Sequence, residues 1–343
     1  MNHSCDPARR RLLKTSLVAG GLAAGGFLSF DALAQGKTRI NMQLGWIPSV
    51  NQVGEVVAKR LGFYEQEGIE FAIQPGGPNI DGVAIVASGR CEIGQVSSSP
   101  SLMLAASQKI PVKCFATGLQ QHPYTFFSLE KKPIRTPKDM IGKKIGIQAT
   151  GKILLSALLK KHNIPEKDVE VVVIGSDFAP LLTGQTDAVT GWLTSTTAIK
   201  GLGQPPVTLR LWDAGVQLYA LPLYATRDTL EKKAPMVAGF LKAMSKGYAF
   251  AQKEPEKAAD LLVKAYPNFK RDDELEGLKV LLKFAFNANT KTNGWGAFDP
   301  KVWQDQITLY DELKQFTAGA PKLDDVITTS ILDATKDARP RIG

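Results

Sequence analysis

The stretch Arg39–Phe71 constrains the fold of this chain more than any other part of the sequence. Apolar and polar residues alternate over residues 40–44, which predicts a strand. Gly45-Trp46-Ile47-Pro48 ends the strand, and apolar residues at helical spacing follow over residues 53–61. Gly62 ends that helix, and Phe63 and Tyr64 lead into a second short strand near residue 70. This order of strand, loop and helix is typical of an α/β fold.

Trp46 lies on the loop between the first strand and the first helix. Ser49 and Asn51 follow it and are both residue types that cap a helix N-terminus. Open α/β sheets bind ligands at such loops, because free backbone N–H groups and the positive end of the helix dipole face outward there. Two interpretations of Trp46 stay open: a ligand-binding aromatic, and a buried core side chain.

The first 34 residues read as an export signal. Arg9-Arg10-Arg11 precedes an Ala- and Gly-rich apolar run that is short and weakly hydrophobic for a membrane span. The paired arginines are typical of the twin-arginine route, and Ala32-Leu33-Ala34 is a small-x-small cleavage site. We therefore expect a mature, periplasmic chain that begins near Gln35.

The mature chain of about 310 residues is long enough for two domains with substantial cores. The whole chain has a formal net charge of +9, but its lysines are scattered, so a nucleic-acid partner is not indicated. The mature chain contains only Cys91 and Cys114, and only His122 and His162, which gives no metal-ligand cluster and no Cys/His nucleophile pair. Whether the two cysteines pair stays open.

Other loops after predicted strands also offer polar groups. Asn79 or Asp81 caps the next helix. A serine run precedes Pro100, which predicts a helix start, and its hydroxyls serve either as caps or as ligand contacts. Thr150 and Gly151 lie at a further helix N-terminus and face a ligand for the same dipole reason. The serine run consists of Ser97, Ser98 and Ser99.

A short internal repeat links the two halves of the chain. Residues 86–94 and 181–189 both read as a helix end, a glycine turn, an acidic residue and a strand. A polar cluster that opens a helix follows each copy, and the second cluster contains Trp192 and Thr194. The pattern predicts one β–α–β arrangement used in two similar lobes. Glu92 and Asp187 are interpreted as turn residues, not as a catalytic pair.

From Pro235 onward the sequence predicts helices, with their aromatic residues in the core. One face of the first helix is apolar, and we expect it to be buried. The tail after Thr335 is expected to be disordered. The apolar face consists of Val237, Phe240, Leu241, Met244 and Tyr248.

Several motifs carry a family resemblance that extends over residues 39–313. They are W-I-P at Trp46, G-F-Y-E-Q-E-G at Gly62, T-P-K-D-M-I-G-K-K-I-G at Thr136, L-P-L-Y-A-T at Leu221 and D-P-K-V-W at Asp299. The chain resembles periplasmic substrate-binding proteins of ABC importers, within the nitrate/taurine/alkanesulfonate group and its thiamine-pyrimidine-binding relatives.

The resemblance implies an α/β fold of type II, in which two lobes, each a mixed sheet flanked by helices, are joined by two crossings. Lobe one is expected to contain residues 37–127 and 222–334, and lobe two residues 128–221. The crossings are expected near residues 125–130 and 220–225. It also implies a monomer that delivers a small-molecule ligand to an importer permease, without a cofactor.

The ligand is expected between the lobes. Trp46 would stack on it, and Trp192 would cover its other face, which suits a flat aromatic ligand. A thiamine pyrimidine precursor is therefore the first hypothesis, and taurine, an alkanesulfonate, nitrate or another small acid is the alternative. The remaining contacts are expected from Asn51, Asn79, Ser97, Ser98, Ser99, Thr150, Gly151 and Thr194.

Two other classes of protein fit the sequence less well. Pyrimidine synthases share this fold in the resembling group, but they carry a cysteine cluster and an active-site histidine without an equivalent here. A transcription regulator would need a helix-turn-helix segment, where this sequence has an export signal. The sequence therefore favours a binding protein that is not an enzyme.

Overall fold

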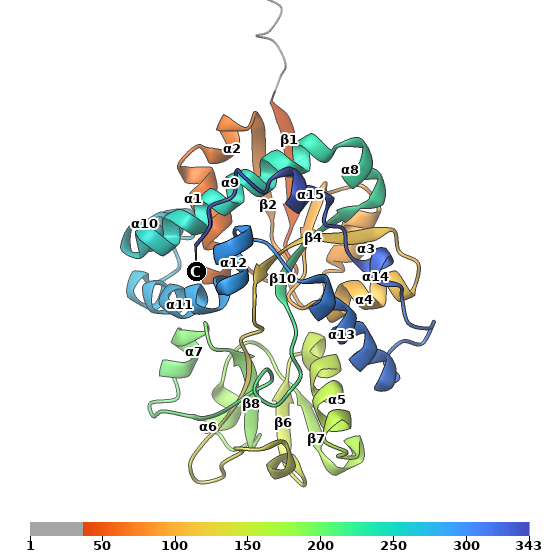
Figure 1. Cartoon of the computed structure of the whole chain (residues 1–343). Helices are drawn as coiled ribbons and strands as arrows, with labels where there is room; N and C mark the ends of the chain where they lie inside the picture. Colours follow the sequence, from red (N-terminus) through yellow and green to blue (C-terminus); the bar gives the residue numbers. More distant parts are fainter. Residues whose placement is uncertain (1–36, 343) are drawn as a thin grey trace, which may run out of the picture. The chain divides into compact units, whose positions relative to one another are not determined.

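The computed structural model describes residues 37–342 (Figure 1). The predicted export signal, residues 1–34, lies outside the described residues. Within residues 37–342 no helix is long and apolar enough to cross a membrane.

Two five-stranded mixed sheets form the framework. The strand order is β2-β1-β3-β10-β4 in the first sheet and β7-β6-β8-β5-β9 in the second. In each sheet the first three strands run parallel, and the fourth runs antiparallel to both of its neighbours. The predicted class, α/β with two mixed sheets flanked by helices, is confirmed. The strands are β1 (Thr38–Gln43), β2 (Ile69–Gln74), β3 (Ile93–Gln95), β4 (Val112–Leu119), β5 (Tyr124–Ser128), β6 (Lys144–Ile147), β7 (Glu170–Val173), β8 (Ala188–Trp192), β9 (Val207–Arg210) and β10 (Ala220–Thr226).

The predicted internal repeat corresponds to equivalent places in the two sheets. It leads into β3 in one copy and into β8 in the other, and each is the third strand of its sheet. The Glu92 carboxylate accepts the N–H of Asn41 in β1 at 2.8 Å, and the Asp187 carboxylate accepts the N–H of Lys144 in β6 at 2.9 Å. Each acid thus fixes a turn against the neighbouring strand, as the turn interpretation predicted.

Two short segments carry the chain between the sheets: residues 120–123 before β5 and residues 211–219 before β10. The N–H of His122 donates to the carbonyl of Leu218 at 3.1 Å, so the two segments are hydrogen-bonded to each other. The crossings were predicted near residues 125–130 and 220–225, and these ranges overlap the strands β5 and β10. The exact division of the chain into two lobes stays a prediction.

Helices surround both sheets (Figure 1). In the figure α1 and α9 lie with the first sheet in the upper half, and α5, α6 and α7 lie with the second sheet below. The shorter helices of the first part are η1 (Val50–Gln52), α1 (Val53–Arg60), α2 (Phe63–Gln66), α3 (Gly82–Ala87) and α4 (Pro100–Ser107). Those of the middle part are η2 (Pro137–Met140), η3 (Ala149–Gly151), α5 (Lys152–Lys161), η4 (Glu166–Asp168), α6 (Ala179–Leu182) and α7 (Thr196–Lys200). The C-terminal part adds α8 (Arg227–Lys232), α9 (Ala234–Lys253), α10 (Pro255–Ala265), α11 (Arg271–Ala285), α12 (Ala288–Asn293), α13 (Pro300–Glu312), α14 (Leu323–Val326) and α15 (Ser330–Ala334).

The second strand lies where the sequence predicted it, as β2, but a helical turn that was not predicted precedes it. Phe63 and Tyr64 do not lead directly into a strand but form a helical turn, α2, which the chain enters through Gly62 at φ 73°. The turn buries Tyr64 completely and stacks its ring on Phe71 with 4.2 Å between centroids. Packing of this ring explains the helical turn.

The predicted apolar face of α9 is confirmed, since all five of its residues are fully buried. Tyr248 on this face stacks on the buried Trp295 with 4.1 Å between centroids. The helices α1 and α9 approach each other closely at two glycines: a Cβ atom added to Gly247 would lie 2.1 Å from the carbonyl oxygen of Gly54. Glycine at this crossing therefore allows the two backbones to touch.

The prediction of a disordered tail after Thr335 was wrong. Arg339 is buried, and its guanidinium donates to the carbonyls of Gly294 at 3.0 Å and Trp295 at 2.6 Å. Burial lowers the pKa of Arg339 to about 10. The sequence contained no signal for these contacts, which span more than forty residues of chain. Cys91 and Cys114 are both buried as free thiols.

A buried carboxyl group lies behind the Trp46 loop. Glu55 in α1 is fully buried, and its Oε1 accepts a hydrogen bond from the Gln95 amide at 2.9 Å. The Gln95 carbonyl accepts from the Gln52 amide at 3.1 Å, and the Gln52 carbonyl accepts from the N–H of Ser49 at 2.9 Å. Burial, opposed by hydrogen bonds from its own backbone N–H and from Gln95, raises the pKa of Glu55 to about 7. This chain of amides connects Glu55 to the loop that carries Trp46.

The packing of α1 against α9 predicts the effect of one added methyl group. We expect Gly247→Ala to lower the free energy of unfolding by about 2 kcal/mol, because the new Cβ atom would overlap the Gly54 carbonyl. The matched control is Gly239→Ala on the same helix, where the nearest neighbouring atom is 3.4 Å from the added Cβ. That variant should be as stable as the wild type or more stable by up to about 1 kcal/mol, since alanine favours the helix. Urea unfolding measures both, and equal stability of the two variants would contradict the close approach.

Glu55 predicts a pH-dependent stability. Because its pKa is higher in the folded protein than the ordinary value of 4.5, the folded state binds more protons in this range, and stability falls as the pH rises from about 4.5 to 7. Glu55→Gln keeps the acceptor for Gln95 but does not titrate. Between pH 5 and pH 8 the wild type should therefore lose about 2 to 3 kcal/mol of unfolding free energy relative to this variant. Parallel stability profiles in urea unfolding would show that Glu55 does not titrate in this window.

Candidate ligand-binding site

A cavity of about 650 Å³ lies between the two sheets and is lined by residues from both. From the first sheet it receives the loops that follow β1, β2 and β3, and from the second sheet the loops that follow β6, β7 and β8. These are the carboxyl ends of the parallel strands, where helix N-termini and free N–H groups also point. The volume is within the range of small-molecule sites.

Trp46 lines this cavity and is half-buried, outside the hydrophobic core of the molecule. Its loop is held by close backbone contacts: a Cβ atom on Gly76 would lie 2.3 Å from the carbonyl oxygen of Leu44, and the N–H of Gly76 donates to the carbonyl of Trp46 at 3.1 Å. Ser49 then caps η1 with Gln52 in a capping box, as its residue type predicted. The Trp46 ring is therefore presented from a fixed loop.

Trp192 lines the same cavity from the second sheet, at the end of β8. Its ring packs edge-on against the imidazole of His122, with 5.1 Å between centroids. Two further rings, Tyr124 and Phe178, also line the cavity from this side. The walls thus offer aromatic surface from both sheets.

Ser98 and His122 form a buried hydrogen-bonded pair at the cavity wall. Ser98 Oγ lies 2.6 Å from Nε2 of His122, and the other ring nitrogen, Nδ1, accepts the N–H of Tyr124 at 3.2 Å. A nitrogen that accepts carries no proton, so in the neutral ring Nε2 bears the hydrogen and donates it to Ser98. Burial, opposed by the nearby Ser97 carbonyl, lowers the pKa of His122 to about 3, which keeps the ring neutral. His122 was not predicted as part of the site.

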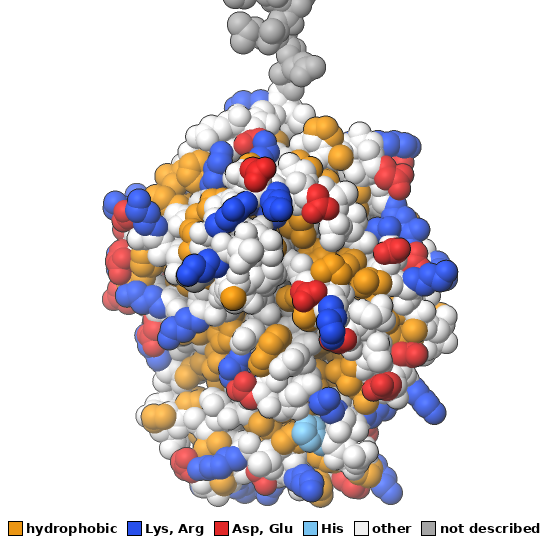
Figure 2. All heavy atoms as spheres, in the orientation of Figure 1, with side chains coloured by type: hydrophobic (Ala, Val, Ile, Leu, Met, Phe, Trp, Pro, Cys, Tyr) orange, Lys and Arg blue, Asp and Glu red, His pale blue; other side chains and the backbone are white. Residues whose placement is uncertain are grey.

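The charged side chains that line the cavity are acidic. They are Asp81, Asp273 and Glu274, and no Lys, Arg or His belongs to the lining among the described residues. Glu274 has a pKa raised to about 7 by burial and by the neighbouring Asp273. Elsewhere, basic and acidic side chains are intermixed over the visible face (Figure 2). The charged residues of the lining are therefore of one type, although the whole chain has a positive net charge.

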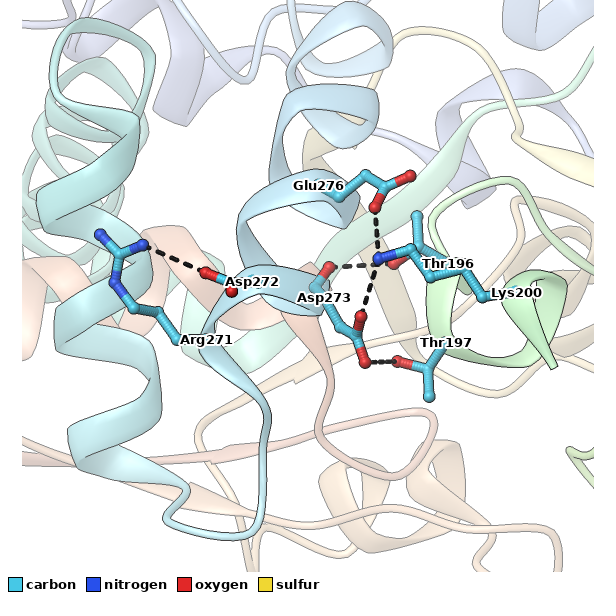
Figure 3. A network of polar contacts seen from close by, with 7 residues as sticks. All are labelled: Thr196, Thr197, Lys200, Arg271, Asp272, Asp273 and Glu276. Carbon is cyan, nitrogen blue, oxygen red and sulfur yellow. Dashed lines mark hydrogen bonds and ion pairs between the residues drawn. The ribbon is translucent and has the colours of Figure 1, made fainter.

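Polar contacts join the second sheet's helix α7 to α11 at the cavity edge (Figure 3). The Thr196 hydroxyl donates to the backbone carbonyl of Asp273 at 2.9 Å, and the Thr197 hydroxyl donates to the Asp273 carboxylate at 3.1 Å. The ammonium of Lys200 lies 2.8 Å from Asp273 and 2.5 Å from Glu276. On the α5 side, Lys160 donates to the carbonyl of Leu313 at 2.5 Å. These bonds hold the two sets of loops around the cavity.

The structure brings most of the predicted site residues to this cavity, and two of them lie elsewhere. The hydroxyl of Thr194 also donates to the Asn51 side chain at 3.3 Å, which links the two sides directly. Asn79 is exposed and is not part of the lining. Asp81 caps α3 instead, by accepting the N–H of Ala84 at 2.9 Å. Ser99 is fully buried behind the wall. The predicted residues that line the cavity are Trp46, Asn51, Ser97, Ser98, Thr150, Gly151, Trp192 and Thr194.

Several lining or supporting residues were missed: His122, Tyr124, Gln52, Gln95, Asp273 and Glu274. The sequence could have indicated Gln95, because an amide side chain at the end of a short apolar strand is costly to bury without a hydrogen-bond partner. In the described part of the chain no group of three or more His, Cys, Asp or Glu side chains could hold a metal ion.

Comparisons with known proteins identify relatives of this chain. The chain is 26% identical over 246 residues to the 4-amino-5-hydroxymethyl-2-methylpyrimidine phosphate synthase of Legionella pneumophila, covering 70% of this chain and 77% of that protein. It is 24% identical over 283 residues to the formylaminopyrimidine-binding protein of Halalkalibacterium halodurans, covering 79% of this chain and 84% of that protein.

Among solved structures, the alkanesulfonate-binding protein SsuA of Xanthomonas axonopodis pv. citri, bound to MOPS, superposes with a TM-score of 0.63. The match covers 85% of this chain and 99% of that chain at 15% sequence identity, which shows a shared fold, that of periplasmic binding proteins. The family model described as NMT1/THI5 like matches residues 49–258, which include the cavity lining except Gly45, Trp46 and Ile47 at one end and the α11 residues at the other. The chain therefore belongs to the NMT1/THI5-like family.

Proposed function

We propose that this protein is the solute-binding component of an ABC importer, and that it captures a flat nitrogen heterocycle of the thiamine-pyrimidine kind. The observation that carries the proposal is the composition of the cavity wall: aromatic rings on both sides, with acidic groups as its charged members. A neutral or positively charged aromatic ring suits such a wall, because it stacks on the rings and is not repelled by the carboxylates.

The same wall disfavours the alternative ligands. A sulfonate, nitrate or other small acid would enter beside Asp273 and Glu274 without a basic side chain in the described lining to pair with it. Nearby carboxylates raise the cost of placing a second negative charge. The fold shared with a sulfonate-binding protein therefore does not decide the ligand.

The names of two relatives support a nitrogen heterocycle as the ligand. One is named for binding formylaminopyrimidine, and another for synthesis of a pyrimidine phosphate. Both names concern a substituted pyrimidine, whose faces are flat and whose ring nitrogens accept hydrogen bonds. We take this as support for the ligand class.

A synthase function is the second candidate, because several relatives carry that name. Ser98 and His122 resemble a nucleophile and base by their 2.6 Å separation. His122 Nε2 already carries a proton, however, so it cannot remove one from Ser98. This arrangement favours binding over catalysis at the cavity.

Two lobes would open to admit the ligand and close around it before delivery to a permease. Residues 37–127 with 222–334 would form one lobe, and residues 128–221 the other, with opening at residues 120–123 and 211–219. The Lys200–Asp273 and Lys160–Leu313 contacts would then join the lobes when the cavity is closed. Export through the predicted twin-arginine signal would bring a monomer to the periplasm, where a membrane permease would accept the ligand.

Trp46 provides the test of the proposal. With purified protein titrated with 4-amino-5-hydroxymethyl-2-methylpyrimidine, Trp46→Ala should weaken binding by about 2 to 4 kcal/mol, a factor of about 30 to 1000, because stacking and buried area are lost. The melting temperature without ligand should not change, since Trp46 lies outside the core.

Trp303→Ala is the matched control, because Trp303 is fully buried and does not line the cavity. It should lower the unfolding free energy by about 3 to 5 kcal/mol. If the wild type does not bind the pyrimidine, or if Trp46→Ala lowers the melting temperature and leaves affinity unchanged, the proposed function of this cavity is wrong.

A further inference from the structure

We propose that Ser98 directs its hydroxyl proton into this site, and that the ligand presents an acceptor to that proton, such as an aromatic ring nitrogen or a carbonyl oxygen. The inference rests on the proposed function and names a feature that the ligand must have. It makes Ser98 a specificity-determining residue whose direction is set by His122.

The first step is the backbone hydrogen bond to the imidazole. The N–H of Tyr124 can only donate, and it points at Nδ1 of His122 from 3.2 Å. Nδ1 must therefore use its lone pair. Because a neutral imidazole has one protonated nitrogen, the hydrogen is on Nε2.

The protonated Nε2 determines the direction of the hydrogen bond between His122 and Ser98. Nε2 of His122 lies 2.6 Å from Ser98 Oγ and has no free lone pair, so the serine oxygen accepts this hydrogen bond. The serine proton then points away from the imidazole. Within residues 37–342 Ser98 Oγ donates to no other group, and Ser98 belongs to the cavity lining. The proton is therefore available to a molecule in the cavity.

Packing and a backbone hydrogen bond prevent the imidazole of His122 from flipping to offer its other nitrogen to Ser98. His122 is fully buried, and its ring packs edge-on against Trp192 and Tyr124, with 5.1 Å and 6.0 Å between centroids. The backbone N–H of His122 donates to the carbonyl of Leu218. A flipped ring would leave the Tyr124 N–H facing a carbon, and a buried unpaired N–H is costly. The donor role of Ser98 thus follows from fixed backbone geometry.

This arrangement separates two kinds of ligand that the aromatic walls alone would accept equally. A ring with an acceptor nitrogen satisfies the Ser98 hydroxyl. The same ring with C–H in place of nitrogen leaves that hydroxyl without a partner once water is displaced.

The experiment compares two probes: 4-amino-5-hydroxymethyl-2-methylpyrimidine and its benzene analogue, with the same substituents and C–H at both ring nitrogen positions. The wild type should bind the pyrimidine about tenfold more tightly, and Ser98→Ala should remove that preference by weakening pyrimidine binding alone. Ser107→Ala is the control, because this buried serine lies outside the cavity lining and donates to Gly319. It should leave both affinities unchanged.

A measurement on the free protein keeps the inference separate from the ligand. Nitrogen-15 NMR of His122 should show a neutral ring with the proton on Nε2 between pH 5 and pH 8. A charged ring, a proton on Nδ1, or a Ser98→Ala variant that keeps the preference for the pyrimidine would overturn the donor role. If the wild type binds neither probe, the proposed function fails and this inference with it, a result that differs from binding without preference.

Discussion

The backbone N–H of His122 donates a hydrogen bond to the carbonyl of Leu218, and the geometry of the candidate site depends on this contact. It joins the two segments that pass between the sheets, next to the cavity formed by the ends of six parallel strands. From the same residue, the buried imidazole contacts Ser98 on one wall and Trp192 on the other. The crossing segments and the cavity wall therefore share His122, and a displacement of its backbone would disturb both.

The charged residues that line the cavity differ in sign from the net charge of the chain. The chain is basic as a whole, and a mild preference for an acidic ligand would follow from charge alone. The charged side chains of the lining are nevertheless acidic, because α11 places Asp273, which is paired with Lys200, and Glu274 at the cavity edge. Close charges in a partly buried cavity act more strongly than distant ones that solvent and salt screen.

Much of the framework could be predicted from the sequence, because it depends on local patterns. The alternation over residues 40–44, the repeat around Glu92 and Asp187, and the aromatic loops at Trp46 and Trp192 all describe short segments. The rest depends on contacts between distant segments. His122 and Ser98 are 24 residues apart in the sequence, and Gln95 and Glu55 are 40 apart. No local sequence pattern therefore predicts either hydrogen bond.

Local ambiguity explains the two predicted residues that lie outside the cavity. Asn79 and Asp81 are both good helix caps, and the fold uses Asp81, which leaves Asn79 exposed beyond the lining. In the serine run, side chains of neighbouring residues face different ways, so Ser98 lines the cavity while Ser99 is buried behind it. Residue type alone does not separate these choices.

The most direct test of the account is a calorimetric titration of the purified wild-type protein with two ligands at low salt: 4-amino-5-hydroxymethyl-2-methylpyrimidine and an alkanesulfonate such as MOPS. The acidic, aromatic cavity predicts binding of the pyrimidine at least about 100-fold more tightly than the sulfonate, a difference of roughly 2.8 kcal/mol. Tighter binding of the sulfonate would contradict the account, because the negative charge would then be held in a cavity whose charged side chains are acidic.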